Sequence, residues 1–334
     1  MNMHATALAH PNIAFIKFWG LADEARRIPA NNSLSMNIGC LATKTSVTFD
    51  PALKADVLTL NDELVSGDGL ARVQRFMDRI RHMAEKDLYA HITSTNNFPI
   101  GAGLASSAAG FAALTLAGTV ALGLSLSEKA LSALARFGSG SACRSIPGGF
   151  VEWVVDPLTG ETYAQSIAPA DHWELVDCIA ILNQDHKPVG SEMGMRSAAS
   201  SPLQAARVAD AKRRFSRCRT AILSRDFAAL SQITELDSNL MHAVMMTSNP
   251  PLYYWRPGSL AIMQAVKAWQ AEGLPVTFTL DAGPNVHLIT TRASVDEVLH
   301  RLRQFPEVID IRSGIPAGPA RLLEQDSPSR TVQV

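Results

Sequence analysis

Apolar residues recur along the first part of the chain with the spacings of strands and helices. β-Branched and polar residues alternate over 46–50, 57–60 and 90–94, with turn residues nearby, so each stretch predicts a strand. Apolar residues recur every three or four positions over 70–86, which predicts an amphipathic helix with one buried face. Another helix is predicted over 128–137, where a Gly-Ser-Gly sequence ends it.

The second half of the chain mixes helical and strand patterns. Residues 191–246 are mostly helical, with an interruption near 200–202. The other predicted elements are strands at 150–155, 176–182, 275–280, 286–290 and 308–312, and helices at 260–272 and 295–305. Strands first, helices next and a mixed end predict an α+β fold in two lobes. We expect lobes at 1–185 and 186–324, followed by a polar tail at 325–334.

One apolar stretch has the composition of a membrane span. No Asp, Glu, Lys or Arg occurs between Asp87 and Glu128, and residues 110–126 are almost wholly apolar. This stretch is only 17 residues long, contains threonines and glycines, and lacks a flanking cluster of positive charge. It therefore predicts a buried helix of a protein that does not span a membrane.

The overall composition excludes several classes of protein. Apolar residues make up 47% of the 334 residues and charged residues 18%, which is typical of a folded globular chain. The formal net charge of −1 provides no overall positive field that would attract a nucleic acid or an anionic membrane. The four cysteines form no metal or disulfide pattern, and the first residues form no secretory leader. We therefore expect a cytoplasmic protein with reduced cysteines and the size of an enzyme.

A segment rich in glycine and serine, residues 99–110, follows a predicted strand and opens the apolar helix. Glycines let a ligand approach the backbone closely, and the free N–H groups of a first helical turn favour an anion. Ser106 and Ser107 add hydroxyl groups at this point. No Gly-Lys-Ser/Thr sequence follows, so this is not a Walker loop. The segment predicts either a phosphate site or a tightly packed helix start.

Three charged residues stand in apolar or glycine-rich surroundings. Arg144 lies among small residues, where its guanidinium suits a carboxylate or a phosphate, unless the segment is a solvated loop. Asp281 ends an apolar strand and begins an Asp-Ala-Gly-Pro turn, where it can act as a base or only close the turn. Lys17 interrupts an apolar run, so it either pairs with an acid such as Asp281 or reaches water at the strand end.

Two other features have structural interpretations. The run 207–220 contains six Lys and Arg residues and predicts a solvated helix face, which could lie at the edge of an active site. His242 is expected to be a hydrogen-bonded structural histidine rather than a ligand, because it lies among methionines on a predicted core helix.

Taken together, these segments resemble the mevalonate diphosphate decarboxylases of the GHMP kinase superfamily. The family's stretches occur in order: Asn-Ile-Ala, Ile-Lys and Trp-Gly within 12–20, Ile-Pro and Asn-Ser-Leu-Ser within 28–35, GLASSAAGFAAL at 103–114, GSGSACRSIPGGFVEW at 138–153, Asp-Ser-Asn and His-Ala within 237–243, and LDAGPN at 280–285. The match extends from about residue 9 to the strand after Asn285. The arginine segment and the DAGPN turn together separate the decarboxylases from most other GHMP kinases.

The resemblance implies a fold and a reaction. The fold would be the two-lobed GHMP kinase fold, with a first lobe like domain 2 of ribosomal protein S5 and a ferredoxin-like second lobe. The reaction would be an ATP-dependent decarboxylation. MgATP phosphorylates the 3-hydroxyl of a phosphorylated mevalonate, and phosphate and CO2 then leave. ATP and Mg²⁺ would be the cofactors, and the protein would be a homodimer.

The resemblance also implies roles for individual residues. Asp281 would orient or deprotonate the 3-hydroxyl, Lys17 would keep Asp281 ionised, and Arg144 would hold the substrate carboxylate. The other expected substrate-binding residues are Asn12, Arg72, Ser139, Gly140 and Ser141. The residues expected at the ATP phosphates are Gly103, Leu104, Ala105, Ser106, Ser107 and Ser191, with Ser107 as a candidate contact for Mg²⁺.

The chain departs from the family near the expected site of the substrate's 5-diphosphate. Leu21 stands where the family usually has a lysine, and Glu192 stands where many bacterial members have an arginine. The loss of two cations and the gain of an anion disfavour the more charged substrate, although Arg72 remains as a phosphate ligand. We therefore expect a preference for mevalonate 5-phosphate, with isopentenyl phosphate as the product.

Three alternatives stay open at this point. The chain could be a diphosphomevalonate decarboxylase that makes isopentenyl diphosphate, with other basic groups replacing those that are lost. It could be a mevalonate 3-kinase that does not decarboxylate, or an inactive homologue that senses a metabolite. The joint presence of Asp281, Lys17 and Arg144 argues against the last two.

Overall fold

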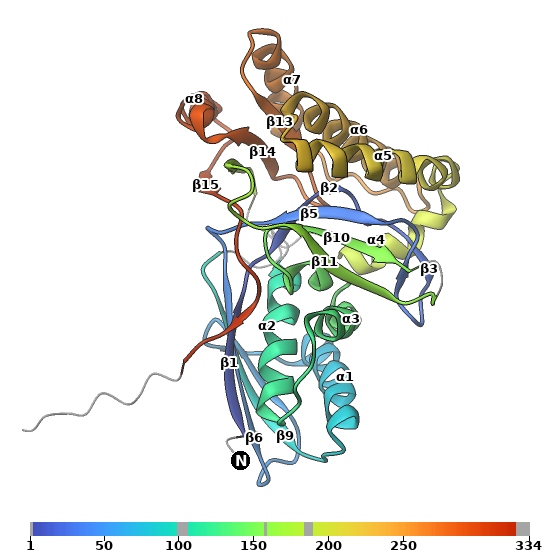
Figure 1. Ribbon diagram of the computed structural model, residues 1–334, viewed down its shortest axis with the longest axis vertical. Helices are drawn as coiled ribbons and strands as arrows, with labels where there is room; N and C mark the ends of the chain where they lie inside the picture. The colour runs from blue at the N-terminus through green and yellow to red at the C-terminus, as the bar shows by residue number, and fades with distance from the viewer. Residues whose placement is uncertain (1–2, 99–105, 157–158, 184–189, 325–334) are drawn as a thin grey trace, which may run out of the picture.

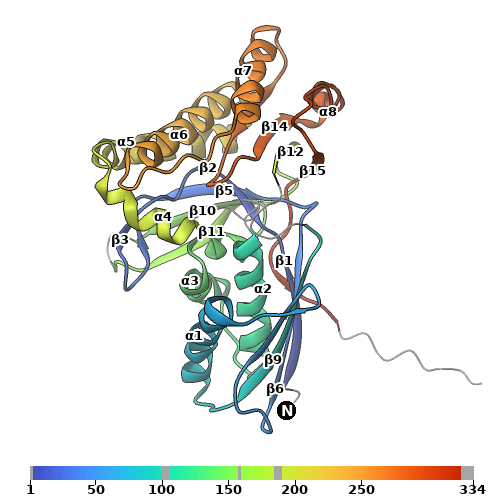
Figure 2. The ribbon, with the colours of Figure 1, turned by 180° about the vertical axis from the view of Figure 1, so that it is seen from behind.

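The computed structural model describes residues 3–98, 106–156, 159–183 and 190–324. In these ranges three larger sheets follow one another along the long axis of the molecule, with helices packed on them (Figures 1 and 2). The expected α+β mixture is confirmed.

The lower part of Figure 1 is a six-stranded sheet with three helices on one face. Its strands in spatial order are β16 (Arg321–Leu322), β1 (His4–Ala9), β6 (Thr43–Asp50), β9 (Tyr89–Asn96), β7 (Val57–Leu60) and β8 (Glu63–Leu64). The central helix, α2 (Ser106–Ala121), packs against β1 and β6. Helices α1 (Gly67–Ala84) and α3 (Glu128–Gly138) pack against α2.

A four-stranded antiparallel sheet crosses the middle of the molecule. Its strands in spatial order are β11 (Thr162–Ala168), β10 (Phe150–Val155), β5 (Ser33–Asn37) and β2 (Asn12–Ile16). A short 3₁₀ helix, η1 (Gly140–Ser145), joins the end of α3 to this sheet. A small ribbon of β3 (Leu21–Asp23) and β4 (Ile28–Pro29) projects beside it.

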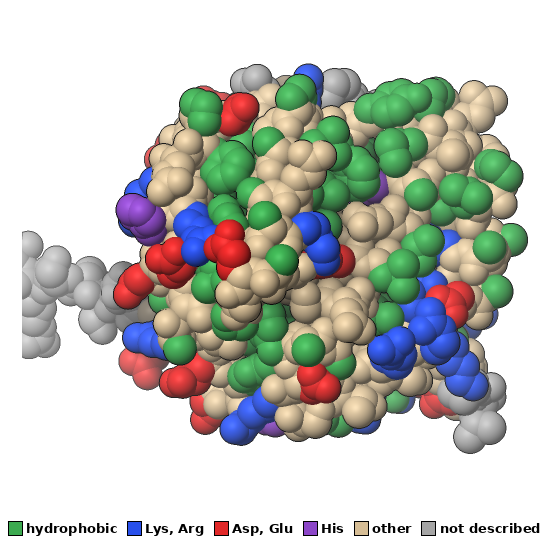
Figure 3. All heavy atoms as spheres, turned by 90° about the horizontal axis from the view of Figure 1, so that it is seen from above, with side chains coloured by type: hydrophobic (Ala, Val, Ile, Leu, Met, Phe, Trp, Pro, Cys, Tyr) green, Lys and Arg blue, Asp and Glu red, His purple; other side chains and the backbone are tan. Residues whose placement is uncertain are grey.

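The upper part contains the third sheet and most of the remaining helices, while α4 lies at the level of the middle sheet. The strands in spatial order are β13 (Val276–Thr279), β14 (Val286–Thr291), β12 (Leu175–Ile181) and β15 (Asp310–Gly314). The helices are α4 (Ser191–Ser197), α5 (Gln204–Ser224), α6 (Phe227–Thr247), α7 (Pro257–Ala271) and α8 (Val295–Leu302), with short 3₁₀ turns η2 (Ala198–Ser200) and η3 (Arg292–Ser294). Viewed from above, acidic, basic and apolar side chains are interspersed on this surface (Figure 3).

Helix α2 accounts for the apolar stretch. Most of its side chains are buried, and many are alanines, which allow close packing against the sheet and the two flanking helices. Its two threonines are satisfied within the helix, because Thr115 donates to the carbonyl of Phe111 and Thr119 to that of Thr115. Among the described residues, no helix is long and apolar enough to cross a membrane.

The strong sequence patterns predict elements that the structure contains, while several strands have no clear pattern. The helix expected at 70–86 is α1, and the strand expected at 46–50 is the end of β6. The pattern gives β2 only as the apolar run before Lys17 and does not predict β5, because both strands are buried along their whole length and so lack alternation. Strand β12 precedes the expected lobe boundary at 185 yet pairs with β14 and β15, and that boundary stays a prediction.

The close packing of Gly138 against Phe111 generates a prediction about stability. A Cβ atom added at Gly138 would overlap the Phe111 ring, whereas one added at Gly110 would meet no atom within 4 Å. We expect Gly138→Ala to lower the free energy of unfolding by about 1–3 kcal/mol through overpacking. Urea denaturation measures this value, with Gly110→Ala as the matched control. Equal stabilities for the two variants would contradict the packing argument.

Candidate active site

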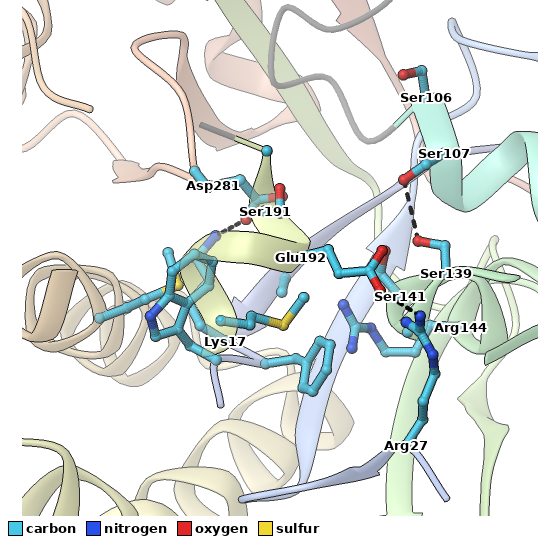
Figure 4. A pocket seen from close by; sticks show the side chains of 18 of the residues that line it. Lys17, Arg27, Ser106, Ser107, Ser139, Ser141, Arg144, Ser191, Glu192 and Asp281 are labelled. Carbon is cyan, nitrogen blue, oxygen red and sulfur yellow. Dashed lines mark hydrogen bonds and ion pairs between the residues drawn. The ribbon is translucent and has the colours of Figure 1, made fainter. Parts of the chain in front are cut away.

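A cavity of about 290 Å³ lies where the three parts of the fold meet. Its walls come from the segment after β2, the beginnings of α2 and α4, the η1 segment, α6 and the turn after β13. Figure 4 shows the side chains of these separate segments directed toward one space. Cavities of this size accommodate small molecules.

Lys17 and Asp281 form an ion pair at one end of the cavity (Figure 4). Lys17 Nζ lies 2.6 Å from Asp281 Oδ1, and the Lys17 side chain is only 1% exposed. The Asp281 side chain is 30% exposed, so this carboxylate is the partner that faces the cavity. Burial raises the pKa of Asp281, but the charge and hydrogen bond of Lys17, helped by His287 and Arg144, outweigh it and lower the pKa. Asp281 is therefore ionised and able to accept a proton or a hydrogen bond.

Arg144 lines the same cavity from η1 and is 3% exposed. Its Nε donates to Asn12 Oδ1 at 3.2 Å and to Ser35 Oγ at 3.0 Å, and its Nη1 donates to Ser33 Oγ at 2.6 Å. These neutral acceptors orient the guanidinium but do not neutralise it, so it can still attract an anionic group. Asn12 itself is 2% exposed and does not line the cavity. It orients Arg144, and the expected role of Asn12 in binding substrate stays a prediction.

Serine hydroxyls line the cavity from the beginnings of α2 and α4. Ser106 and Ser107 begin α2, and Ser191 begins α4. Ser107 Oγ lies 3.1 Å from Ser139 Oγ, which links the start of α2 to the arginine segment (Figure 4). Ser139, Gly140 and Ser141 line the cavity as expected. The three other residues expected at phosphate, Gly103, Leu104 and Ala105, lie outside the described residues.

A chain of alternating charges forms a further part of the wall. Glu192 Oε1 lies 2.6 Å from Arg27 Nη2, and Glu192 Oε2 lies 3.8 Å from Arg72 Nη2. Burial raises the pKa of Glu192, but Arg27, Arg72 and Arg196 outweigh it, so the pKa is lowered and the carboxylate is charged. Arg72 is further held by two hydrogen bonds to the Gly138 carbonyl. Leu21 lines a smaller hollow of about 110 Å³ beside Glu192.

Two groups of side chains at or behind the cavity carry no recognisable sequence signal. Arg27 reaches the cavity from a charged turn that has no recognisable motif. The expectation of a solvated face for 207–220 is wrong at two positions, because Arg207 is 2% exposed and Arg214 is fully buried. Both contact the buried Asp237 region behind Lys17, and only the tertiary fold brings these segments together.

His242 lies on α6 behind the ion pair and is 1% exposed. Its ring stacks on Trp255, with 4.9 Å between ring centroids. The expectation of a fully hydrogen-bonded histidine is wrong at one atom, because Nε2 has no partner among the described residues. Burial and the nearby charge of Lys17 lower the pKa of His242 to about 3, against the smaller effects of the Leu280 and Asp281 carbonyl groups and the Asp281 charge. The histidine is therefore neutral.

Comparison with known proteins assigns this arrangement to a family. A sequence model described as the diphosphomevalonate decarboxylase-like N-terminal domain matches residues 9–167. A second one, described as the mevalonate 5-diphosphate decarboxylase C-terminal domain, matches residues 178–324. The chain belongs to the diphosphomevalonate decarboxylase family.

Individual relatives cover nearly the whole chain. The diphosphomevalonate decarboxylase of Ganoderma lucidum is 37% identical over 329 residues, which cover 91% of this chain and 82% of that protein. The crystal structure of mevalonate diphosphate decarboxylase from Staphylococcus aureus matches with a TM-score of 0.90 and 38% identity, covering 96% of this chain and 98% of that one. The structure of MDDEF in complex with MVAPP, AMPPCP and magnesium matches with a TM-score of 0.89 and 38% identity. The match covers 96% of this chain and 99% of that one. The family resemblance and the two-lobed GHMP kinase fold are confirmed.

The buried neutral state of His242 predicts a pH-dependent stability. Its folded pKa of about 3 lies below the usual histidine pKa of 6.5, so between these values the unfolded chain binds a proton that the folded chain does not. Stability should therefore fall as the pH drops through this window. From pH 6.5 to 5 we expect the wild type to lose about 1.6 kcal/mol more than His242→Asn, because the unfolded histidine is already half protonated at pH 6.5. Urea denaturation across this range tests it, with His91→Asn as the exposed control, and parallel curves for wild type and His242→Asn would refute it.

Proposed function

We propose that this protein catalyses the ATP-dependent decarboxylation of mevalonate 5-diphosphate to isopentenyl diphosphate. The buried Lys17–Asp281 ion pair, which lines one cavity with Arg144, carries the proposal. The relatives named above are diphosphomevalonate decarboxylases, and the related MDDEF structure contains MVAPP, AMPPCP and magnesium. This substrate is the alternative left open by the sequence, and the comparisons favour it over the expected mevalonate 5-phosphate.

The first step uses the ionised Asp281. Lys17 holds this carboxylate in its charged form. Asp281 therefore accepts the proton of the substrate's C3 hydroxyl while the C3 oxygen forms a bond to the γ-phosphorus of ATP. The bond between that phosphorus and the β-phosphate oxygen breaks, and ADP leaves. The serine hydroxyls at the beginnings of α2 and α4 face the region where we place the nucleotide phosphates.

The second step breaks the substrate apart. Arg144 holds the C1 carboxylate in line, and its orientation is maintained by Asn12, Ser33 and Ser35. When the C1–C2 bond breaks, its electron pair forms the C2=C3 double bond, and the C3–O bond breaks with it. CO2 and inorganic phosphate leave, and an alkene remains.

The site also fits the cofactors that the resemblance implies. The described residues contain no group of three His, Cys, Asp or Glu side chains that could hold a metal. Mg²⁺ prefers phosphate oxygens and water, so it would be held by the nucleotide, with the Ser107 hydroxyl as the nearby protein oxygen. When bound, the ion supplies positive charge that stabilises the transferring phosphoryl group. The cytoplasmic location and the homodimer stay predictions.

A second candidate substrate, mevalonate 5-phosphate, is favoured by one observation. Glu192 places a negative charge in the cavity wall and pairs with Arg27 and Arg72, the cations nearest to it. An anion there weakens the attraction for the more highly charged diphosphate. Arg27, however, adds a cation to the cavity wall from a turn that carries no motif. The wall therefore keeps more arginines than carboxylates, which supports the diphosphate.

A paired assay tests the proposed substrate. Purified protein receives MgATP with either mevalonate 5-diphosphate or mevalonate 5-phosphate, and CO2 and ADP are measured together. We expect equal amounts of CO2 and ADP, with the higher kcat/KM for the diphosphate. A higher kcat/KM for the monophosphate would select the second candidate. ADP without CO2 would indicate a 3-kinase, and neither product would indicate a metabolite sensor.

The variant Glu192→Gln makes the same assay sensitive to the wall charge. Removing this anion should raise kcat/KM for the diphosphate more than for the monophosphate, by up to roughly tenfold, which corresponds to 1.4 kcal/mol. Glu24→Gln is the matched control, because Glu24 pairs with Arg196 on the exposed side of the same region. Equal effects of Glu192→Gln on both substrates would show that this carboxylate does not select between them.

The role of Asp281 predicts a selective loss of turnover. Asp281→Asn retains the shape of the side chain but removes the proton acceptor, so kcat should fall by roughly 10²–10⁴-fold, the usual contribution of a general base. Binding of a non-hydrolysable ATP analogue should stay near the wild-type affinity. Asp171→Asn, an exposed site, serves as the control. Turnover within a few-fold of the wild type would rule out this role for Asp281.

A further inference from the structure

Lys17 lies just beyond the end of β2, where regular strand pairing has stopped. The last pair between β2 and β5 is Ile16 with Leu34, so the backbone groups of Lys17 find no partner in the sheet. Side chains take their place. The Lys17 N–H donates to Asp237 Oδ2 at 2.6 Å, and its carbonyl accepts from Arg207 Nη2 at 2.8 Å and from Asn31 Nδ2 at 3.0 Å. Both backbone groups of Lys17 are therefore held by long-range side-chain contacts.

These side chains form one connected network behind the cavity. Arg214 Nε donates to Asp237 Oδ1 at 2.7 Å, and Arg214 Nη2 donates to the Arg207 carbonyl at 2.9 Å. Arg207 Nη1 continues to the Trp19 carbonyl at 3.1 Å and to Asn31 Oδ1 at 3.2 Å. We refer to Asn31, Arg207, Arg214 and Asp237 as the Lys17 clamp. None of the four lines the cavity.

The clamp places full charges in the interior of the protein. Asp237 and Arg214 are fully buried, and Arg207 is 2% exposed. Burying such groups costs solvation free energy, and apolar residues of similar size in their place are often neutral or stabilising. A network of this kind is therefore weak evidence for stability. Its contacts instead specify the geometry of a single backbone segment, which carries the lysine of the active site.

We infer that the Lys17 clamp positions the Lys17 ammonium against Asp281, so that its residues are positioning residues for the reaction. This inference rests on the proposed role of the Lys17–Asp281 pair. The lysine side chain is long and flexible, so a fixed backbone removes the freedom that would otherwise let Nζ leave the 2.6 Å contact. A displacement of about 1 Å can cost roughly 10²-fold in rate even when it originates far from the reacting atoms.

The variant Arg207→Lys keeps the positive charge but loses the forked contact with the Lys17 and Trp19 carbonyls. We expect kcat to fall by roughly 10²-fold with little change in KM for ATP. In a plot of kcat against pH, the acid limb should move to higher pH, because the pKa of Asp281 rises when the Lys17 ammonium moves away from it. The substitution leaves unchanged the other charged or titratable groups near Lys17 and Asp281, which are Arg144, His287, His242 and Asp237. Arg217→Lys, on the exposed side of the same helix, is the matched control.

A double variant separates positioning from general structural support. If the clamp acts through Lys17, then Arg207→Lys should cost nothing further in a Lys17→Met background, because the ammonium that it positions is already absent. Independent effects of the two substitutions on kcat would overturn the inference, as would an unshifted acid limb in Arg207→Lys. Asn31→Ala removes the contacts of Asn31 with the Lys17 carbonyl and with Arg207 Nη1, while Arg207 keeps its contacts with the Lys17 and Trp19 carbonyls. It should show a smaller change of the same sign, and it is the variant to use if Arg207→Lys does not fold.

A measurement without turnover distinguishes failure of the clamp from failure of the proposed function. Brief acetylation of lysines, read by peptide mass spectrometry, reports how accessible each amine is. Lys17 should react far more slowly than the exposed Lys212 in the wild type, and faster in Arg207→Lys and Asn31→Ala. Unchanged labelling of Lys17 in both variants would overturn the inference. An inactive wild type with increased labelling in the variants would remove the proposed function and leave the positioning of Lys17 intact.

Discussion

The ion pair between Lys17 and Asp281 is the interaction on which the arrangement of the site depends. It joins two residues that lie 264 positions apart, one after the first strand of the middle sheet and one in the turn after β13 of the third sheet. A lysine that is 1% exposed requires a partner of opposite charge, and the aspartate requires the lysine to remain ionised beside an apolar core. The pair therefore couples the closure of the fold to the chemistry of the cavity.

The surrounding groups divide into those that face the cavity and those that support them. Arg144 faces the cavity, while Asn12, Ser33 and Ser35 hold its guanidinium from behind. The same division applies to Lys17 and its clamp. In both cases a cation next to the ligand space is oriented by buried polar groups, which is how a site keeps its geometry without filling the space that a substrate needs.

The wall around Glu192 illustrates a limit of counting charges along a sequence. Glu192 and Leu21 suggested a site poor in positive charge, but Arg27 approaches from a turn that carries no motif. A long side chain can place its charge several ångströms from its backbone, so the charge of a cavity depends on which turns fold toward it. The electrostatic character of this wall was therefore not predictable from the two substituted positions alone.

By itself, the sequence determined the family and much of the local structure. The spacing in α1, the small residues of α2 and the Asp-Ala-Gly-Pro turn identify these features because helix periodicity and turn chemistry act over a few neighbouring residues. Only the tertiary structure decided that Arg207 and Arg214 turn inward, that Asn12 supports Arg144, and that Arg27 meets Glu192. Those outcomes depend on contacts between segments far apart in the chain. A charged helix face has the same sequence pattern whether water or a buried carboxylate lies opposite it.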